Sequence, residues 1–187
     1  MKEKLVAHLK ELSAVAAASA DALGADIERA AAMVAATVQR GGTLFFCGNG
    51  GSAADAQHMS TEYVVRYNKE RRAVAAIALT VDLSILTAAA NDYSYEQVFA
   101  RQVEALCKPG DLLILHTTSG KSPNLLRAIE KAREKSVATL ALSAKGGGPI
   151  KDLADHTIVI PTNRTDRAQE MQLAIQHAIC DMIDEMV

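Results

Sequence analysis

The sequence predicts an α/β protein, built as a three-layer αβα sandwich around a five-stranded parallel sheet. Five apolar runs of strand length recur along the chain, and segments with helical periodicity lie between them. The runs are apolar throughout, which is typical of parallel strands covered by helices on both faces. Right-handed crossovers between such strands give a doubly wound sheet. The strands are expected at residues 44–47, 74–79, 112–116, 137–142 and 157–160.

The N-terminal region is expected to be helical and to lie outside the α/β alternation. Residues 3–39 contain no proline and a single glycine, Gly24, and their apolar residues recur at helical spacing. This pattern predicts one long helix, or two helices broken near Gly24. The apolar surface of the segment 1–40 fits packing on a partner subunit, and it equally fits a cover over one edge of the sheet.

The remaining helices are expected between and after the strands. The first of them should begin behind the turn 48–51, with Ser52 as a favourable N-cap residue, and Pro123 suits the first position of a later helix. The expected spans are about 53–67, 83–90, 95–106 and 123–134, a short helix near Lys151, and a last helix over about 166–186.

Composition excludes several classes of function. At 187 residues the chain is most simply one domain, and its formal net charge of −2 comes without the basic patch that nucleic acid requires. Cys47, Cys107 and Cys180 lack metal-ligand spacing and fit a reducing compartment. There is no signal-peptide pattern and no apolar stretch of membrane-spanning length. We expect a cytoplasmic protein without nucleic-acid or membrane partners.

Two loops at the carboxyl ends of predicted strands are candidate phosphate sites. Residues 48–52 form a glycine-rich turn between a strand and a helix, where unpaired N–H groups and the helix dipole favour an anion. Residues 117–122 offer four hydroxyls, a glycine and Lys121 just before another helix. The alternative for the second loop is an ordinary Ser/Thr capping turn. Neither loop has the P-loop or G-x-G-x-x-G pattern, so no nucleotide cofactor is expected.

Ionisable side chains accompany the first of these loops. His58 and Glu62 are four residues apart and therefore share one helix face. The last helix carries a polar set within an apolar pattern, and His177 belongs to it. Taken singly, the first pair is typical of a solvated face, and His177 of a half-buried structural residue. Beside a phosphate site, an imidazole and a carboxylate indicate chemistry on a small phosphorylated molecule.

Several motifs resemble the sugar isomerase (SIS) domain family. The resemblance extends from about residue 30 to the C-terminus, and its motifs are specific in combination. They are CGNGGSAADAQH (47–58), Glu62-x-x-x-Arg66-Tyr67, AIALT (76–80), ANDY (90–93), VFARQVEAL (98–106) and TSG-x-SPN (118–124). The resemblance implies the SIS fold, with residues 1–187 as a single SIS domain.

The resemblance also implies roles for individual residues. Glu62 and His177 would be the catalytic acid/base pair. One zinc ion per active site would be bound by His58, Glu62, Gln169 and His177. Substrate would be bound by Asn49, Gly50, Gly51, Ser52, Glu62, Arg66, Asn91, Asp92, Thr117, Thr118, Ser119, Ser122, Asp166 and Gln169. Gln169 and His177 are eight residues apart, about 12 Å along a straight helix, so an irregular helix start or ligands from two subunits would be needed.

The activity implied is an aldose–ketose isomerisation. It would interconvert sedoheptulose 7-phosphate and D-glycero-D-manno-heptose 7-phosphate through an enediol, which needs a carboxylate at carbon and a second group at the oxygens. Zinc would polarise the carbonyl. The family is cytoplasmic and forms homotetramers with active sites at subunit interfaces.

Departures from the family pattern keep two alternatives open. Lys121, His116 and Gln172 stand where the family usually has Asn, an aliphatic residue and His, and Val65 and Tyr63 also differ. The substrate could therefore be a longer phosphoketose, such as an octulose 8-phosphate. A further alternative is a non-catalytic SIS binding module that partners a replication initiator; the acidic and imidazole side chains beside the phosphate loops favour the enzyme.

Overall fold

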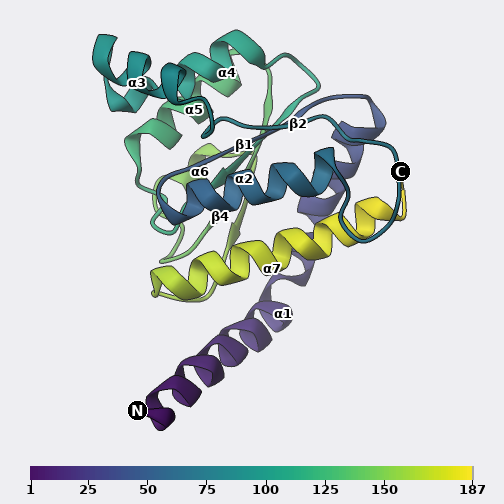
Figure 1. Cartoon of the computed structure of the whole chain (residues 1–187), viewed down its shortest axis with the longest axis vertical. Helices are drawn as coiled ribbons and strands as arrows, with labels where there is room; N and C mark the ends of the chain where they lie inside the picture. Colours follow the sequence, from purple (N-terminus) through teal and green to yellow (C-terminus); the bar gives the residue numbers. More distant parts are fainter. Residues whose placement is uncertain (187) are drawn as a thin grey trace.

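The chain folds around one parallel sheet of five strands in the order β2-β1-β3-β4-β5, as the sequence predicts (Figure 1). The computed structural model describes residues 1–186; Val187, the last residue of the domain expected over 1–187, lies outside the described residues. The central pair is in register from Leu44 opposite Leu112 to Gly48 opposite His116. The strands are β1 (Leu44–Gly48), β2 (Ala76–Ala78), β3 (Leu112–His116), β4 (Ala138–Ser143) and β5 (His156–Val159).

Helices cover both faces of the sheet and complete the predicted three layers. One apolar core lies between the sheet and α1, α2 and α7, and a second lies under α4, α5 and α6 on the other face. Successive side chains of each central strand point alternately into the two cores, because side chains of a strand alternate between the two faces of the sheet. The helices are α1 (Lys2–Gln39), α2 (Gly51–Val64), α3 (Leu83–Asp92), the 3₁₀ helix η1 (Tyr95–Gln97), α4 (Ala100–Leu106), α5 (Pro123–Glu134), α6 (Ile150–Leu153) and α7 (Thr165–Asp184).

The N-terminal region is a single helix that runs unbroken through Gly24, so the alternative of two helices is wrong. A glycine inside a helix costs only about 1 kcal/mol relative to alanine. Burial of Ala30, Val34 and Val38 against the sheet and α7 outweighs that cost. The first half of α1 projects away from the body (Figure 1), and its Leu5 is 65% exposed.

Some predicted boundaries need correction. Helix α2 begins at Gly51 with Gly50 as its N-cap, so Ser52 lies inside the first turn and is not the cap. Gly50 has φ of 58°, in the left-handed region that glycine adopts without strain. The same helix ends at Val64 rather than at Tyr67. Strand β2 spans three residues instead of six because it is an edge strand that pairs only with β1. The segment 95–106 divides into η1 and α4.

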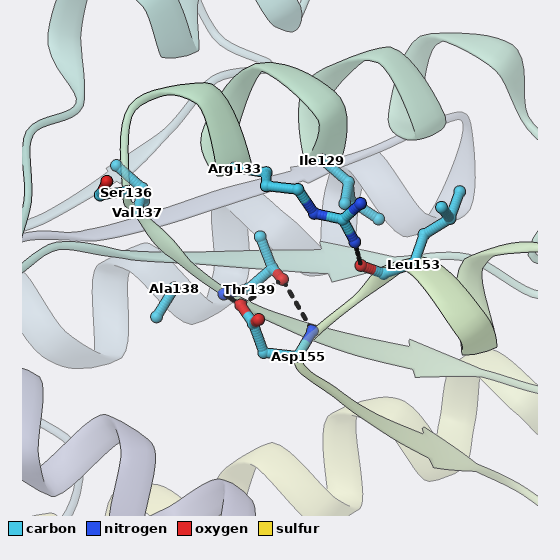
Figure 2. A pocket seen from close by; sticks show the side chains of 8 residues that line it. All are labelled: Ile129, Arg133, Ser136, Val137, Ala138, Thr139, Leu153 and Asp155. Carbon is cyan, nitrogen blue, oxygen red and sulfur yellow. Dashed lines mark hydrogen bonds between the residues drawn. The ribbon is translucent and has the colours of Figure 1, made fainter.

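The two ends of the sheet differ in character. At the amino ends of β4 and β5, a hollow of about 290 Å³ lies beside Arg133 and Asp155 (Figure 2). Arg133 donates to the carbonyl oxygen of Leu153 at 2.9 Å, and Asp155 accepts the backbone N–H and the hydroxyl of Thr139, each at 2.8 Å. These bonds tie structural elements together. The loops that follow β1 and β3 lie at the opposite end of the sheet.

Within residues 1–186 we find no helix long and apolar enough to span a bilayer.

Candidate active site

The two predicted phosphate loops lie side by side because they leave adjacent, in-register strands. Together with α5 and the start of α7 they enclose a cavity of about 300 Å³. Each loop leads directly into a helix, so two helix N-termini with their positive dipole ends approach the cavity. The cavity is lined by Asn49, Gly51, Ser52, His116, Thr117, Thr118, Ser119, Ser122, Leu125, Thr165 and Gln169. Most of the residues predicted to contact a sugar phosphate are therefore brought together.

Amide and hydroxyl bonds fix the mouth of this cavity. The side chains of Asn49 and Asn124 exchange two hydrogen bonds of 2.9 and 2.8 Å, joining the first loop to α5. The phenol of Tyr95 donates to the same Asn49 oxygen at 3.0 Å. In the second loop, the Thr117 hydroxyl accepts the N–H of Gly120 at 3.1 Å. Neither Asn124 nor Tyr95 was predicted, although Asn124 ends the TSG-x-SPN motif.

Gly120 allows the second loop to pack against the glycine turn after β4. Its φ is 64°, and a Cβ atom there would lie 1.8 Å from the carbonyl oxygen of Gly147. Backbone cannot yield to such an approach, so only glycine fits. Helix α5 then begins with Pro123 at its first position, as predicted, and Ser122 caps it without a side-chain bond. The Ser122 hydroxyl is thus left for a ligand in the cavity.

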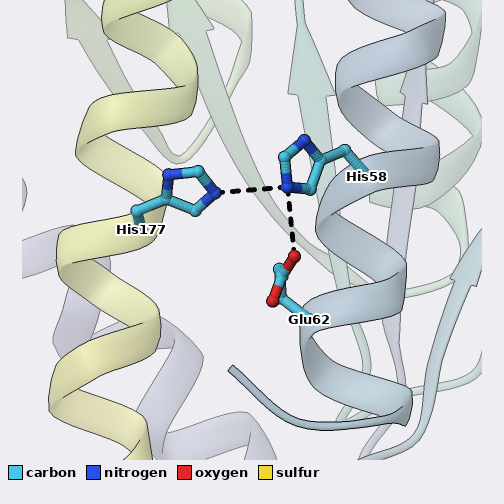
Figure 3. A group of neighbouring side chains, drawn as sticks. All are labelled: His58, Glu62 and His177. Atoms are coloured by element: carbon cyan, nitrogen blue, oxygen red, sulfur yellow. Dashed lines mark hydrogen bonds and ion pairs between the residues drawn. The ribbon is translucent and has the colours of Figure 1, made fainter. Parts of the chain in front are cut away.

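A second group of side chains points from α2 and α7 toward one another (Figure 3), and none of its members lines the cavity. The His58 Nε2 atom is 3.0 Å from Oε1 of Glu62 and 3.4 Å from Nε2 of His177. One donor atom from each of the three residues lies within 4.8 Å of the others. Tyr67 stacks on the His177 ring with centroids 5.3 Å apart. We refer to His58, Glu62 and His177 as the triad.

The chemistry of the triad fits a cation. Two imidazole nitrogens that face each other beside a carboxylate need a shared proton or a metal ion between them. Nitrogen and carboxylate oxygen are the ordinary ligands of zinc. Burial lowers the pKa of His177, and the neighbouring His58 lowers it further, while Glu62 acts in the opposite direction. The His177 imidazole is therefore neutral at pH 7, the form that binds a metal or accepts a proton.

The fourth predicted metal ligand is placed elsewhere. Gln169 lies over the first turn of α2, where its amide would be 2.5 Å from a Cβ added to Gly51. It lines the phosphate cavity, two helical turns from His177 on a regular α7. The start of α7 is thus not irregular, and within one chain three of the four predicted ligands gather.

Five other predicted site residues belong to neither group; one of them, Gly50, lies in the first loop between two residues that line the cavity. Asp166 accepts hydrogen bonds from Arg164 at the start of α7, and these lower its pKa. Asn91 donates to the neighbouring Asp92 at the end of α3. Arg66 lies 3.8 Å from Glu70 beyond the end of α2, and Asp92 lines a hollow between α3 and α4. Their predicted contacts with substrate stay predictions.

Two buried ionisable groups were given no role from the sequence: His116, which lines the cavity and was noted only as a departure from the family pattern, and Asp55. His116 is fully buried and hydrogen-bonded to Gln176, and burial lowers its pKa to about 4. A histidine directly before the second loop was the available signal. Asp55, one turn before His58, has an oxygen without a protein partner; burial raises its pKa to about 6, against the effect of His58.

Comparison with known proteins identifies the family of the chain. The family model described as SIS domain matches residues 7–144. A Campylobacter jejuni protein named phosphoheptose isomerase is 50% identical over 169 residues, which cover 90% of this chain and 91% of the relative. One from Aquifex aeolicus is 43% identical and covers 100% and 98%. A solved phosphoheptose isomerase from Neisseria gonorrhoeae superposes with a TM-score of 0.93 at 37% identity over 98% of both chains. The chain therefore belongs to the SIS domain family and, within it, to the phosphoheptose isomerases, which are aldose–ketose isomerases.

Proposed function

We propose that the protein interconverts sedoheptulose 7-phosphate and D-glycero-D-manno-heptose 7-phosphate. The observation that carries this proposal is the spacing along α2 between the phosphate cavity and the triad. Ser52 and His58 are six residues apart and Glu62 is four further, which is about 9 and 15 Å along the helix. An extended seven-carbon sugar phosphate spans about 10 Å from C1 to phosphorus, at about 1.2 Å per bond of an extended chain. With its phosphate in the cavity, its carbonyl end reaches the triad.

In this proposal neutral donors bind the phosphate, because no lysine or arginine is among the described residues that line the cavity. Hydroxyls of the second loop and the N-terminal ends of α2 and α5 supply donors and a favourable field. This arrangement holds the phosphate as an anchor while the far end of the sugar reacts. In this proposal Thr117, Thr118, Ser119 and Ser122 hold the phosphate group, and Asn49, Gly50, Gly51 and Ser52 contact the sugar phosphate.

The triad supplies the acid and base. Isomerisation moves a proton between C2 and C1 through an enediol, so one group must reach carbon and another must serve the two oxygens. We assign the first role to the Glu62 carboxylate and the second to the His177 imidazole. The lowered pKa of His177 keeps the imidazole neutral at pH 7, so that it can accept one proton and donate another.

We further propose that the triad binds zinc. His58, Glu62 and His177 offer two nitrogens and an oxygen within bonding range of one ion. When bound, zinc polarises the substrate carbonyl and stabilises negative charge on its oxygen. Gln169, the fourth ligand that the family resemblance implies, lies in the phosphate cavity of its own chain, which favours a ligand set drawn from two subunits.

The placement of predicted site residues away from the site of their own chain also supports a homotetramer with active sites at subunit interfaces. Arg66, Asn91, Asp92 and Asp166 belong neither to the cavity lining nor to the triad of their own chain, and we infer that they contact the site of a neighbouring subunit. The exposed apolar side chains of Leu5, Val6 and Leu9 in the first half of α1 support packing on partner subunits, with residues 1–187 as one SIS domain. Three free, buried cysteines fit a cytoplasmic location.

The proposal is tested by proton NMR of sedoheptulose 7-phosphate incubated with the protein in D₂O. We expect new aldose anomeric signals and deuterium at the carbon beside the carbonyl, and loss of both after chelation. Turnover of an octulose 8-phosphate alone would instead assign the longer substrate. If both sugars bind but neither reacts, the proposed isomerase activity is contradicted. The remaining hypothesis would then be the non-catalytic module that partners a replication initiator.

A further inference from the structure

A buried ion pair joins the segment after α2 to the end of α7. The side chains of Arg71 and Asp184 are 2% and 0% exposed, and Nε of Arg71 donates to Oδ1 of Asp184 at 2.7 Å. The second carboxylate oxygen accepts the backbone N–H groups of Asn68 and Lys69 at 2.8 and 2.9 Å. Burial acts to raise the pKa of Asp184, but these hydrogen bonds outweigh burial and lower it. Donors from the segment after α2 therefore keep the Asp184 carboxylate ionised, and the same bonds join that segment to α7.

The other side of the Arg71 guanidinium closes the end of α2. Its Nη2 atom donates to the carbonyl oxygen of Glu62 at 2.6 Å, and Nη1 donates to that of Tyr63 at 2.9 Å. These two carbonyls belong to the last turn of the helix, whose carbonyls lack the intrahelical N–H partners of the helix interior. The Tyr63 carbonyl also accepts the N–H of Val74 at 3.0 Å. The helix lacks the usual glycine at this end: its C-cap is Val65, and its last turn contains no basic residue. Arg71, seven residues beyond the end of the helix, supplies a cap for the Glu62 carbonyl and shares that of Tyr63 with Val74.

The pair therefore joins the two helices that carry the triad. Glu62 is on α2 and bonded to Arg71 through its own backbone, whereas His177 lies two turns before Asp184 on α7. A shift of Arg71 would move the Glu62 backbone relative to His177. We propose that Arg71, oriented by Asp184, is the positioning residue that sets the Glu62 carboxylate against His177 for proton transfer. This inference rests on the isomerase function proposed above.

The geometry requires arginine rather than a cation in general. Three N–H directions of one planar group are used at once, toward the Asp184 carboxylate and the carbonyls of Glu62 and Tyr63. A lysine ammonium at position 71 keeps the charge and the pairing with Asp184, but it lacks the planar fork that reaches the two carbonyls. A purely structural ion pair would be largely restored by lysine, and a positioning role would not.

The experiment compares Arg71→Ala, Arg71→Lys and Asp184→Asn with the wild type. We measure kcat and KM for sedoheptulose 7-phosphate, at a temperature well below the Tm of every variant. The matched control is Lys69→Met, because the exposed Lys69–Glu185 pair, 3.4 Å long, joins the same segment to the same helix. We expect kcat of Arg71→Lys to fall about 10- to 100-fold, the effect of misplacing a catalytic group by about 1 Å. KM should stay within about twofold because the phosphate cavity is untouched, and the control should match the wild type.

A second measurement separates this inference from the proposed function. Imidazole ¹H–¹⁵N spectra report the surroundings of His58 and His177 without any turnover. We expect their signals to shift in Arg71→Lys and Asp184→Asn, but not in Lys69→Met. An absence of turnover in the wild type would contradict the function alone, and the spectra would still decide the positioning role. Wild-type kcat in a folded Arg71→Lys protein, or unshifted imidazole signals in both variants, would overturn the inference.

Discussion

Replacing Gly51 with alanine should move one side chain of the site without disturbing the fold. The backbone of Gly51 is outside the left-handed region, so alanine adopts it without strain. The new Cβ would lie 2.5 Å from Nε2 of Gln169 and 2.9 Å from its Cδ. Carbon and nitrogen atoms in contact are about 3.5 Å apart, so the amide must withdraw by about 1 Å. The amide ends a flexible side chain, and alanine in a helix is favoured over glycine by about 0.5–1 kcal/mol, so Tm should not fall.

The kinetic cost follows from the role predicted for Gln169. Loss of one hydrogen bond to the substrate is worth about 0.5–1.5 kcal/mol, which raises KM about 2- to 10-fold. The assay is steady-state isomerisation of sedoheptulose 7-phosphate, with Gly24→Ala as the control. Gly24 lies in α1 with nothing within 4 Å of an added Cβ, so its replacement should raise Tm and leave KM unchanged.

A double substitution tests the mechanism of this effect. If Gly51→Ala acts only by displacing Gln169, then adding it to Gln169→Ala should change nothing further. Unchanged KM in Gly51→Ala, or effects of the two substitutions that simply add, would refute the reasoning.

Three further predictions concern substrate anchoring, acid stability and assembly. Ser119→Ala combined with Ser122→Ala should raise KM with little change in kcat; an unchanged KM, measured by the same assay, would place the phosphate elsewhere. Burial lowers the pKa of His116 to about 4, so between pH 6.5 and 4 the unfolded chain binds more protons than the folded chain. The free energy of unfolding should therefore fall as the pH falls through this window, by up to about 3 kcal/mol. Urea unfolding of His116→Leu should show a shallower slope against pH; an unchanged slope would contradict the assignment. Leu5 and Leu9 are 65% and 66% exposed, and changing both to glutamate should dissociate the proposed tetramer while helical circular dichroism persists. A variant that has the same mass as the wild-type oligomer in light scattering would exclude this half of α1 from the interface.

The sheet could be predicted from sequence because its strands are short, mainly apolar runs. Strand β3 has the predicted bounds, Leu112–His116, because polar residues stand at both of its ends. Strand β2 was harder because pairing on one side only, rather than hydrophobicity, decides where an edge strand ends. The continuity of α1 through Gly24 also depends on tertiary packing, which outweighs a small local propensity.

Contacts within one helix of the site could be predicted from sequence, whereas contacts between its helices could not. The pairing of His58 with Glu62 follows from helical spacing, and their approach to His177 requires knowledge of how α7 lies against α2. The position of Gln169 in the phosphate cavity depends on which turn of α7 meets Gly51. No local pattern gives that register, and none links Arg71 to the carbonyl of Glu62 nine residues earlier.

The most direct test of the account is solvent exchange catalysed by Glu62→Gln. The substitution keeps the size of the side chain and removes the carboxylate that we assign to proton transfer. In D₂O the wild type should introduce deuterium into sedoheptulose 7-phosphate, whereas Glu62→Gln should bind the sugar and introduce none. Persistent deuterium incorporation by a folded Glu62→Gln protein would contradict the assignment of Glu62 as the base and, with it, the proposed mechanism.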